Sequence, residues 1–89
     1  MLEWDEAKRQ LTLIRRGLDF ADAKRVFAGR TMTLPDERRP YGEKRFITAG
    51  WLDDRFVVLV WTRRGGKRRI ISMRYGRAEE EAGRRSQMG

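Results

Sequence analysis

The spacing of hydrophobic positions divides this chain into a helical part, before residue 30, and a strand-forming part after it. Apolar residues three and four positions apart predict a helix from Glu6 to Arg16 that buries one stripe. That stripe consists of Ala7, Leu11, Ile14 and Leu18. Asp5 is the expected N-cap, and Gly17 is the residue expected to end the helix.

A second short helix is predicted from Phe20 to Ala28, with Asp19 as its N-cap. Its apolar stripe consists of Phe20, Ala23, Val26 and Phe27. Helices of these lengths are not stable alone in water, so both are expected to pack on a sheet. Ahead of them, residues 2–4 are expected to form a short strand or an ordered arm.

The strand-forming part is centred on a β-hairpin between Arg55 and Arg74. Two β-branched and aromatic runs, Val57–Trp61 and Ile70–Met73, flank a reversal whose two glycines permit positive φ angles. Further strands are predicted over residues 31–34 and 43–52, joined by an exposed polar loop.

The expected fold class is therefore α+β, with two N-terminal helices packed on one face of an antiparallel β-meander. All 89 residues are expected to form a single domain. Its ordered core is expected at about residues 2–75, and residues 76–89 are expected to form a short helix or to be disordered.

Two turns determine which residues share a face of the sheet. A two-residue turn at Asp53–Asp54 pairs Leu52 with Arg55. A four-residue turn at Arg63–Gly66 pairs Thr62 with Lys67. The face expected to pack on the helices carries Ile47, Ala49, Trp51, Phe56, Val58, Val60, Ile71 and Met73. The face expected to be open carries Phe46, Thr48, Gly50, Val57, Leu59, Trp61, Arg68, Ile70, Ser72 and Arg74. The alternative is that the N-terminal arm or the C-terminal tail covers this second face.

Charge points to an anionic partner. The net charge is +8, and residues 41–78 alone carry ten cations against three anions. Most of the cations are arginine, whose planar guanidinium matches phosphate and stacks on bases. RNA bases are therefore expected to stack on Phe46 or Trp61. Backbone phosphates are expected to bind Arg63, Arg64, Lys67 and Arg68. The alternative is an arginine-rich surface, set by genome composition, that has no function.

The sequence contains neither cysteine nor histidine. Disulfides, thiolate metal sites and the usual general base are thereby excluded, so no metal and no cofactor is expected. The start of the chain lacks the order of a signal peptide, and no apolar run is long enough to cross a bilayer. A cytoplasmic protein without membrane contact is expected.

Four segments in the same order resemble the BrnT family. They are Leu2–Lys8, Gly17–Ala23 with Val26 and Phe27, Tyr41–Ile47, and Arg69–Arg74. This resemblance implies a toxin of a bacterial type II toxin–antitoxin system, with a RelE-like fold and an RNA substrate. It also implies a BrnA-like DNA-binding antitoxin as partner, through which operator DNA is contacted only indirectly.

The sequence departs from the family pattern in two places. Many members end the first helix with Lys-His-Gly, where this chain has Arg15-Arg16-Gly17. After Arg74 the family usually continues into a basic tail, whereas this chain runs into three glutamates, Glu79–Glu81.

Metal-independent RNA cleavage needs a base for the 2′-hydroxyl, cations for the phosphorane and an acid for the leaving oxygen. Glu43 is the carboxylate candidate for the base, and a lysine or arginine held near other cations is the alternative. The expected stabilising cations are Arg45, Arg69 and Arg74, and Ser72 is expected to orient a phosphate oxygen. The predicted register places Arg45 and Arg69 on the helix side and Arg74 opposite, so they meet only if the strands twist or a bulge intervenes. A non-catalytic module that binds RNA or a protein partner is the competing hypothesis.

Overall fold

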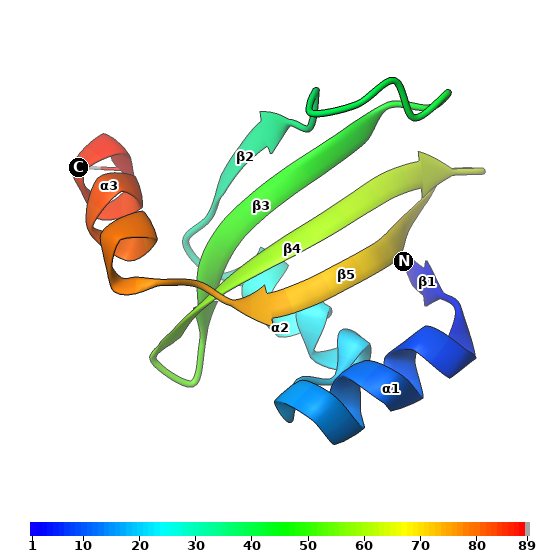
Figure 1. Ribbon diagram of the computed structural model, residues 1–89, viewed down its shortest axis with the longest axis horizontal. Coiled ribbons are helices and arrows are strands. Elements are labelled where there is room, and N and C mark those ends of the chain that lie inside the picture. Colours follow the sequence, from blue (N-terminus) through cyan, green and yellow to red (C-terminus); the bar gives the residue numbers. More distant parts are fainter. Residues whose placement is uncertain (89) are drawn as a thin grey trace.

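A five-stranded sheet forms the centre of the molecule, in the order β1-β5-β4-β3-β2 (Figure 1). The computed structural model describes residues 1–88. The strands are β1 Leu2–Trp4, β2 Met32–Pro35, β3 Arg45–Leu52, β4 Arg55–Arg64 and β5 Lys67–Tyr75. The helices are α1 Glu6–Arg16, η1 Phe20–Asp22, α2 Ala23–Ala28 and α3 Ala78–Met88, with η1 a 3₁₀ turn. The predicted α+β class is confirmed.

The sheet is mixed, so the prediction of a purely antiparallel sheet is wrong. Strands β2 to β5 form the expected antiparallel meander. The N-terminal arm adds β1 parallel to β5, with Leu2 opposite Arg68 and Trp4 opposite Ile70. An edge strand presents unpaired backbone groups, and the arm pairs with the part of β5 from Arg68 to Ile70.

The first helix has the predicted ends. A side-chain oxygen of Asp5 accepts from the backbone N–H of Ala7 at 2.9 Å, and Gly17 adopts the left-handed conformation with φ 68°. The second predicted helix is divided into η1 and α2. Asp19 accepts from the backbone N–H of Ala21 at 2.9 Å, as expected of an N-cap.

The helices η1 and α2 pack on the face of the sheet that was expected to be open. Their buried residues are Phe20, Ala23 and Val26. Together with Leu18 in the preceding link, these residues form one core cluster with Val57, Leu59, Trp61, Ile70 and Met73. On β3, on β4 and on β5 as far as Ile70 the faces are therefore exchanged relative to the prediction, whereas Met73 lies on the helix side as predicted. Both faces of β3 and β4 are apolar, so hydrophobicity alone does not choose between them. Gly50 distinguishes the two faces, because α2 approaches the sheet closely on the side where Gly50 has no side chain. A Cβ at this position would lie 2.8 Å from Cγ1 of Val26.

Helix α1 contacts the rest of the protein through its polar side, so its predicted burial is wrong. Leu11 and Ile14 are 45% and 79% exposed, and no residue of α1 is buried. Arg9 instead binds Asp19 through two hydrogen bonds of 2.7 and 3.0 Å. Arg16 donates from Nη1 to the carbonyl oxygen of Met73 at 2.9 Å.

The turn between β4 and β5 has two residues, Gly65 and Gly66, with φ 55° and 80°. The predicted four-residue turn and its register are wrong, whereas the predicted β3–β4 register is confirmed. A bulge at Ile71 lies between the Trp61–Ile70 and Val60–Ser72 pairs. One extra residue exchanges the faces of all later side chains, so Met73 and Tyr75 point toward the helices.

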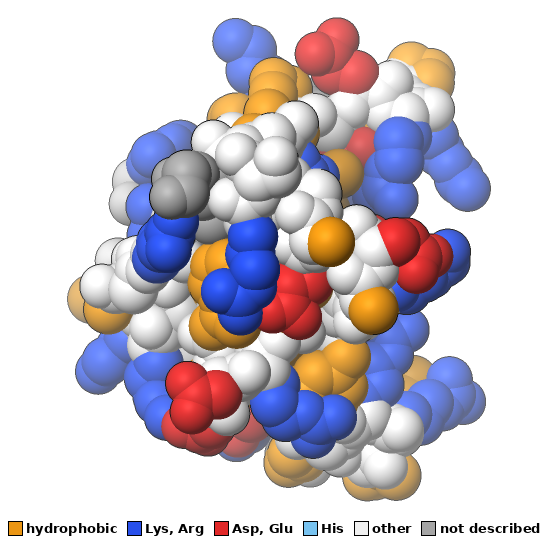
Figure 2. All heavy atoms as spheres, turned by 90° about the vertical axis from the view of Figure 1, so that its left-hand side faces the viewer, with side chains coloured by type: hydrophobic (Ala, Val, Ile, Leu, Met, Phe, Trp, Pro, Cys, Tyr) orange, Lys and Arg blue, Asp and Glu red, His pale blue; other side chains and the backbone are white. Residues whose placement is uncertain are grey.

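Helix α3 covers part of the opposite face, at the end of the sheet away from β1 (Figure 1). Glu81 accepts from the indole N–H of Trp51 at 3.1 Å, and Glu80 binds Arg74. Helices therefore lie on both faces, in contrast to the predicted single helical layer. Seen from the α3 end, basic and acidic side chains are interspersed around small apolar areas (Figure 2). No helix among residues 1–88 is long and apolar enough to cross a membrane.

Candidate functional site

The face that carries α3, here called the outer face, brings together four of the predicted catalytic residues. Arg45 of β3 pairs with Thr62 of β4, which pairs with Arg69 of β5. Ser72 and Arg74 follow on the same face because of the bulge at Ile71. The prediction that Arg45 and Arg69 lie on the helix side is therefore wrong. The bulge that their convergence with Arg74 required is present.

At one end of the outer face lies a small cavity, here called the basic cleft, with a volume of about 170 Å³. It is lined by Asp5, Lys8, Glu43, Arg45, Arg64, Arg69, Ile70 and Ile71. The basic cleft thus brings four cations, Lys8 and three arginines, together with the carboxylates of Asp5 and Glu43. Three of the predicted catalytic residues, Glu43, Arg45 and Arg69, meet here.

Glu43 is held between two arginines. Its Oε2 accepts from Nε of Arg45 at 3.1 Å, and its Oε1 lies 3.6 Å from Nη2 of Arg64. The side chain is partly exposed, so it remains within reach of a ligand. A carboxylate next to guanidinium groups can accept a proton while the cations bind phosphate oxygens.

Two further contacts orient the arginines. The guanidinium of Arg45 stacks 4.1 Å from the ring centre of Tyr41. Arg69 donates from Nη1 to Oε2 of Glu3 at 2.8 Å. The role of Glu3 was missed in the sequence because its position beside Arg69 depends on the parallel pairing of β1 with β5. Lys8 was missed as well, although its place on the first turn of α1 follows from the Asp5 cap.

Arg74 lies outside the basic cleft and is bound by α3. Its two terminal nitrogens donate to the two carboxylate oxygens of Glu80, each at 2.9 Å. The hydrogen bonds from Arg74 lower the pKa of Glu80 to about 2, and Glu80 in turn raises the pKa of Arg74. Ser72, half-buried on the same strand, does not line the cleft either.

The predicted base-stacking residues lie on the helix side of the sheet, so the prediction that they lie on an open face is wrong. Trp61 is only 4% exposed, and its indole N–H donates to Oγ1 of Thr48 at 2.8 Å. The ring of Phe46 lies 4.8 Å from that of Trp61. Because the faces of β3 and β4 are exchanged, Trp61 belongs to the core cluster and the partly buried Phe46 packs against it, so the two rings are not an open platform.

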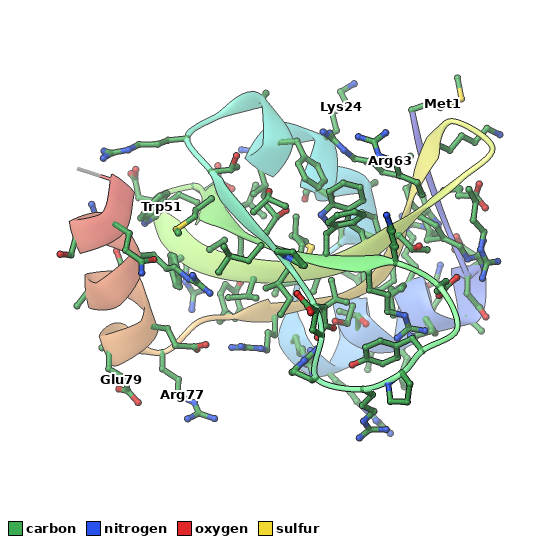
Figure 3. All side chains as sticks on the ribbon, turned by 90° about the horizontal axis from the view of Figure 1, so that it is seen from above. Met1, Lys24, Trp51, Arg63, Arg77 and Glu79 are labelled. Atoms are coloured by element: carbon green, nitrogen blue, oxygen red, sulfur yellow. The ribbon has the colours of Figure 1, made fainter. Side chains whose placement is uncertain are left out.

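The predicted phosphate-binding cations of the hairpin are divided between the two faces. Arg68 stacks 4.0 Å from the ring centre of Phe27, and Arg63 lies 5.5 Å from that of Trp61, both on the helix side. Figure 3 shows Arg63 and Lys24 on the same side, far from Trp51 and α3. Arg64 faces the cleft, and Lys67 is exposed at the tip.

The loop over residues 36–44 forms a larger cavity beside the basic cleft. Its volume is about 780 Å³, and Glu43 and Arg45 line both cavities. The carboxylate of Asp36 is buried and accepts two hydrogen bonds of 2.7 Å from Arg38, which lower its pKa to about 2. This ion pair fixes the start of a loop that the sequence identified only as polar and exposed.

Within residues 1–88, no group of three or more acidic side chains has an arrangement suited to a metal ion.

Comparison with known proteins identifies one family. A family model described as the ribonuclease toxin, BrnT, of type II toxin–antitoxin systems matches residues 4–80. The matched segment includes every residue of the basic cleft and reaches Glu80 at the start of α3. None of the curated proteins matches the chain.

Proposed function

Because the chain belongs to the BrnT family of ribonuclease toxins from type II toxin–antitoxin systems, we propose that it cleaves RNA internally, without a metal ion, at the basic cleft. The observation that carries this proposal is the convergence of Glu43, Arg45 and Arg69 from β3, β5 and the loop before β3. A carboxylate among guanidinium groups supplies both a proton acceptor and stabilisation of phosphate charge.

In the proposed reaction, the 2′-hydroxyl of a ribose attacks the adjacent phosphorus as Glu43 accepts its proton. The bond between the 2′-oxygen and phosphorus forms, and the bond to the 5′-oxygen breaks. Arg45 and Arg69 stabilise the negative charge of the phosphorane, because charge-assisted hydrogen bonds are strongest where charge accumulates. Lys8 also lines the cleft, and we assign its ammonium group as the acid that donates a proton to the leaving 5′-oxygen. The products are a 2′,3′-cyclic phosphate and a 5′-hydroxyl.

The RNA on either side of the cut is proposed to follow the outer face. The larger loop cavity adjoins the cleft through Glu43 and Arg45 and is large enough for a nucleotide. Arg74 and Ser72 continue the same face toward α3, so they are proposed to contact a neighbouring phosphate when Glu80 releases Arg74. Cleavage of cytoplasmic RNA would inhibit translation, and a BrnA-like DNA-binding antitoxin is the proposed neutralising partner.

The test is incubation of the purified protein with RNA in EDTA, followed by analysis of the fragment ends. Glu43→Gln and Arg69→Ala are each expected to lower the cleavage rate by about 10²-fold. Arg55→Ala is the matched control, since Arg55 is exposed and lies at the opposite end of β4 beside Tyr75. Equal rates for all three variants would contradict the assignment of the cleft.

A non-catalytic RNA-binding module is the second candidate. It is favoured by the ion pairs that occupy Glu43, Glu3 and Arg74 in the isolated chain. A gel shift without fragments from the wild-type protein in EDTA would support this candidate. Growth arrest on expression alone, relieved by the antitoxin but retained in Glu43→Gln, would support it too.

A further inference from the structure

Helix α1 carries its apolar stripe on the side away from the protein. Ala7, Leu11 and Ile14 are spaced four and three residues apart, so they lie on one side of the helix. All three are exposed, and Ile14 is 79% exposed. The opposite side of α1 holds the helix in place through Arg9 and Arg16, which bind Asp19 and the carbonyl of Met73. We call Ala7, Leu11 and Ile14 the α1 stripe.

The α1 stripe contributes no core burial to the isolated chain. Burial of a leucine or isoleucine side chain is favourable in proportion to the apolar area removed from water. Ile14 is 79% exposed and Leu11 45% exposed, so most of that gain is unrealised at Ile14 and almost half of it at Leu11. A single exposed apolar residue is ordinary, whereas a stripe aligned along one helix is typical of a surface that a partner helix covers. Helix α1 is therefore amphipathic, and its apolar side is left exposed by the rest of residues 1–88.

We propose that the α1 stripe is the surface on which the antitoxin docks, through an amphipathic helix or strand-like segment that carries acidic residues beside its apolar positions. The identity of the partner rests on the proposed toxin function. The acidic character follows from Lys8 and Arg15, which flank the stripe and have no acidic partner among residues 1–88. Opposite charges at the rim of an apolar contact give specificity and fast association.

A second copy of this chain fits the surface less well. In a symmetric contact the same patch faces itself, so Lys8 and Arg15 of one copy would approach the same cations of the other. Like charges in such a contact are unfavourable. An acidic partner removes this repulsion, and for that reason we assign the surface to the antitoxin.

The position of α1 explains how docking would inhibit the enzyme. Asp5 and Lys8, at the first turn of α1, also line the basic cleft. A partner that lies along the α1 stripe therefore reaches the edge of the cleft, where its carboxylates compete with RNA phosphate for Lys8 and the neighbouring arginines. One contact would provide both affinity and neutralisation.

The experiment measures binding of the full-length toxin to the antitoxin encoded beside it, by isothermal titration calorimetry. The double variant Leu11→Gln/Ile14→Gln is expected to weaken binding by at least about 30-fold, since two buried aliphatic side chains are lost from the contact. The matched control is Leu34→Gln on β2, where an apolar side chain is 39% exposed and lies far from α1 in the sheet order. Arg15→Glu provides a second variant and is expected to weaken binding in a salt-dependent manner.

Unchanged antitoxin affinity in the double variant would overturn the proposal. So would a self-associating wild-type protein whose dimer, but not its antitoxin complex, is lost in the double variant. RNA cleavage by the free double variant is expected to equal that of the wild type, which separates the two proposals. If wild-type protein does not cleave RNA but the double variant loses the antitoxin, the catalytic proposal fails and the docking proposal stands.

Discussion

At the scale of single residues, Gly50 determines how closely α2 approaches the sheet. A Cβ at this position would lie 2.8 Å from Cγ1 of Val26 and 3.1 Å from Cγ2 of Thr31. We expect Gly50→Ala to lower the free energy of unfolding by about 1–3 kcal/mol, because a well-packed core accommodates an added methyl group only by shifting its neighbours. Urea denaturation measures the change.

The control for this substitution is Gly83→Ala in α3. A Cβ there meets nothing within 4 Å, and alanine favours helix over glycine by about 1 kcal/mol. Gly83→Ala is therefore expected to be neutral or stabilising. If both variants behave alike, the close approach of α2 at Gly50 is not what limits that position.

The ion pair of Asp36 makes the stability of the folded protein depend on pH in the acid range. Its folded-state pKa is about 2, lowered by Arg38 from an ordinary value of 3.8, so the unfolded chain binds the proton more readily. Its stabilising contribution is present above about pH 4 and is lost as the pH falls toward 2. We expect Asp36→Asn to lower the melting temperature at pH 7 and to reduce its fall between pH 5 and 2.

The measurement is the melting temperature as a function of pH for both proteins. Glu37, the exposed neighbour of Asp36, provides the control as Glu37→Gln, whose curve is expected to follow that of the wild type. Parallel curves for Asp36→Asn and the wild type would show that the Asp36–Arg38 pair is not the source of acid sensitivity.

At the scale of elements, α3 competes with RNA for the outer face. Glu80 neutralises Arg74 through two hydrogen bonds, while the adjacent Glu79 is exposed and has no ion pair among the described residues. We expect Glu80→Gln to raise the affinity for single-stranded RNA several-fold more than Glu79→Gln, although both remove one negative charge. Fluorescence anisotropy with a labelled oligonucleotide measures the difference. Equal effects would mean that only the net charge matters and that Arg74 does not contact RNA.

Boundaries and registers that are set by residues adjacent in the sequence were predicted correctly. The α1 boundaries follow from the Asp5 cap and Gly17, and the β3–β4 register follows from the Asp53–Asp54 turn. The side of α1 that faces the core could not be predicted, because Arg9 binds Asp19 only once the chain has folded. A helical stripe shows which side is apolar and does not show what covers it.

The candidate site was predicted in part. Glu43, Arg45 and Arg69 were identified by residue type, and the structure brings them together. The two-residue Gly65–Gly66 turn places Arg69 opposite Thr62, level with Arg45, and the Ile71 bulge then leaves Arg74 on the same face. Neither feature is fixed by the alternating pattern. A one-residue change in register exchanges the faces of a strand, so local pattern could not distinguish the two arrangements.

At the scale of the whole molecule, positive charge is spread over several faces. Arg63 and Lys24 lie on the helix side (Figure 3), where Arg68 stacks on Phe27. The basic cleft lies on the outer face. A net charge of +8 attracts RNA to the whole surface, whereas only the cleft combines cations with a proton acceptor. Non-specific binding and cleavage should therefore respond differently to changes in charge.

Salt dependence separates the two contributions. If Arg45, Arg64 and Arg69 each contact a phosphate, they account for about 2 units of the slope of log affinity against log salt, at about 0.7 per phosphate for single strands. We expect Arg69→Ala to reduce the magnitude of the slope by about 0.7 and also to abolish most of the cleavage. Lys24→Ala, which removes a cation from the helix side, is expected to leave the cleavage rate at saturating RNA unchanged. Filter binding from 50 to 300 mM salt, with cleavage followed in parallel, measures both quantities. A cleavage rate that falls equally in the two variants would mean that total charge, and not the basic cleft, limits the reaction.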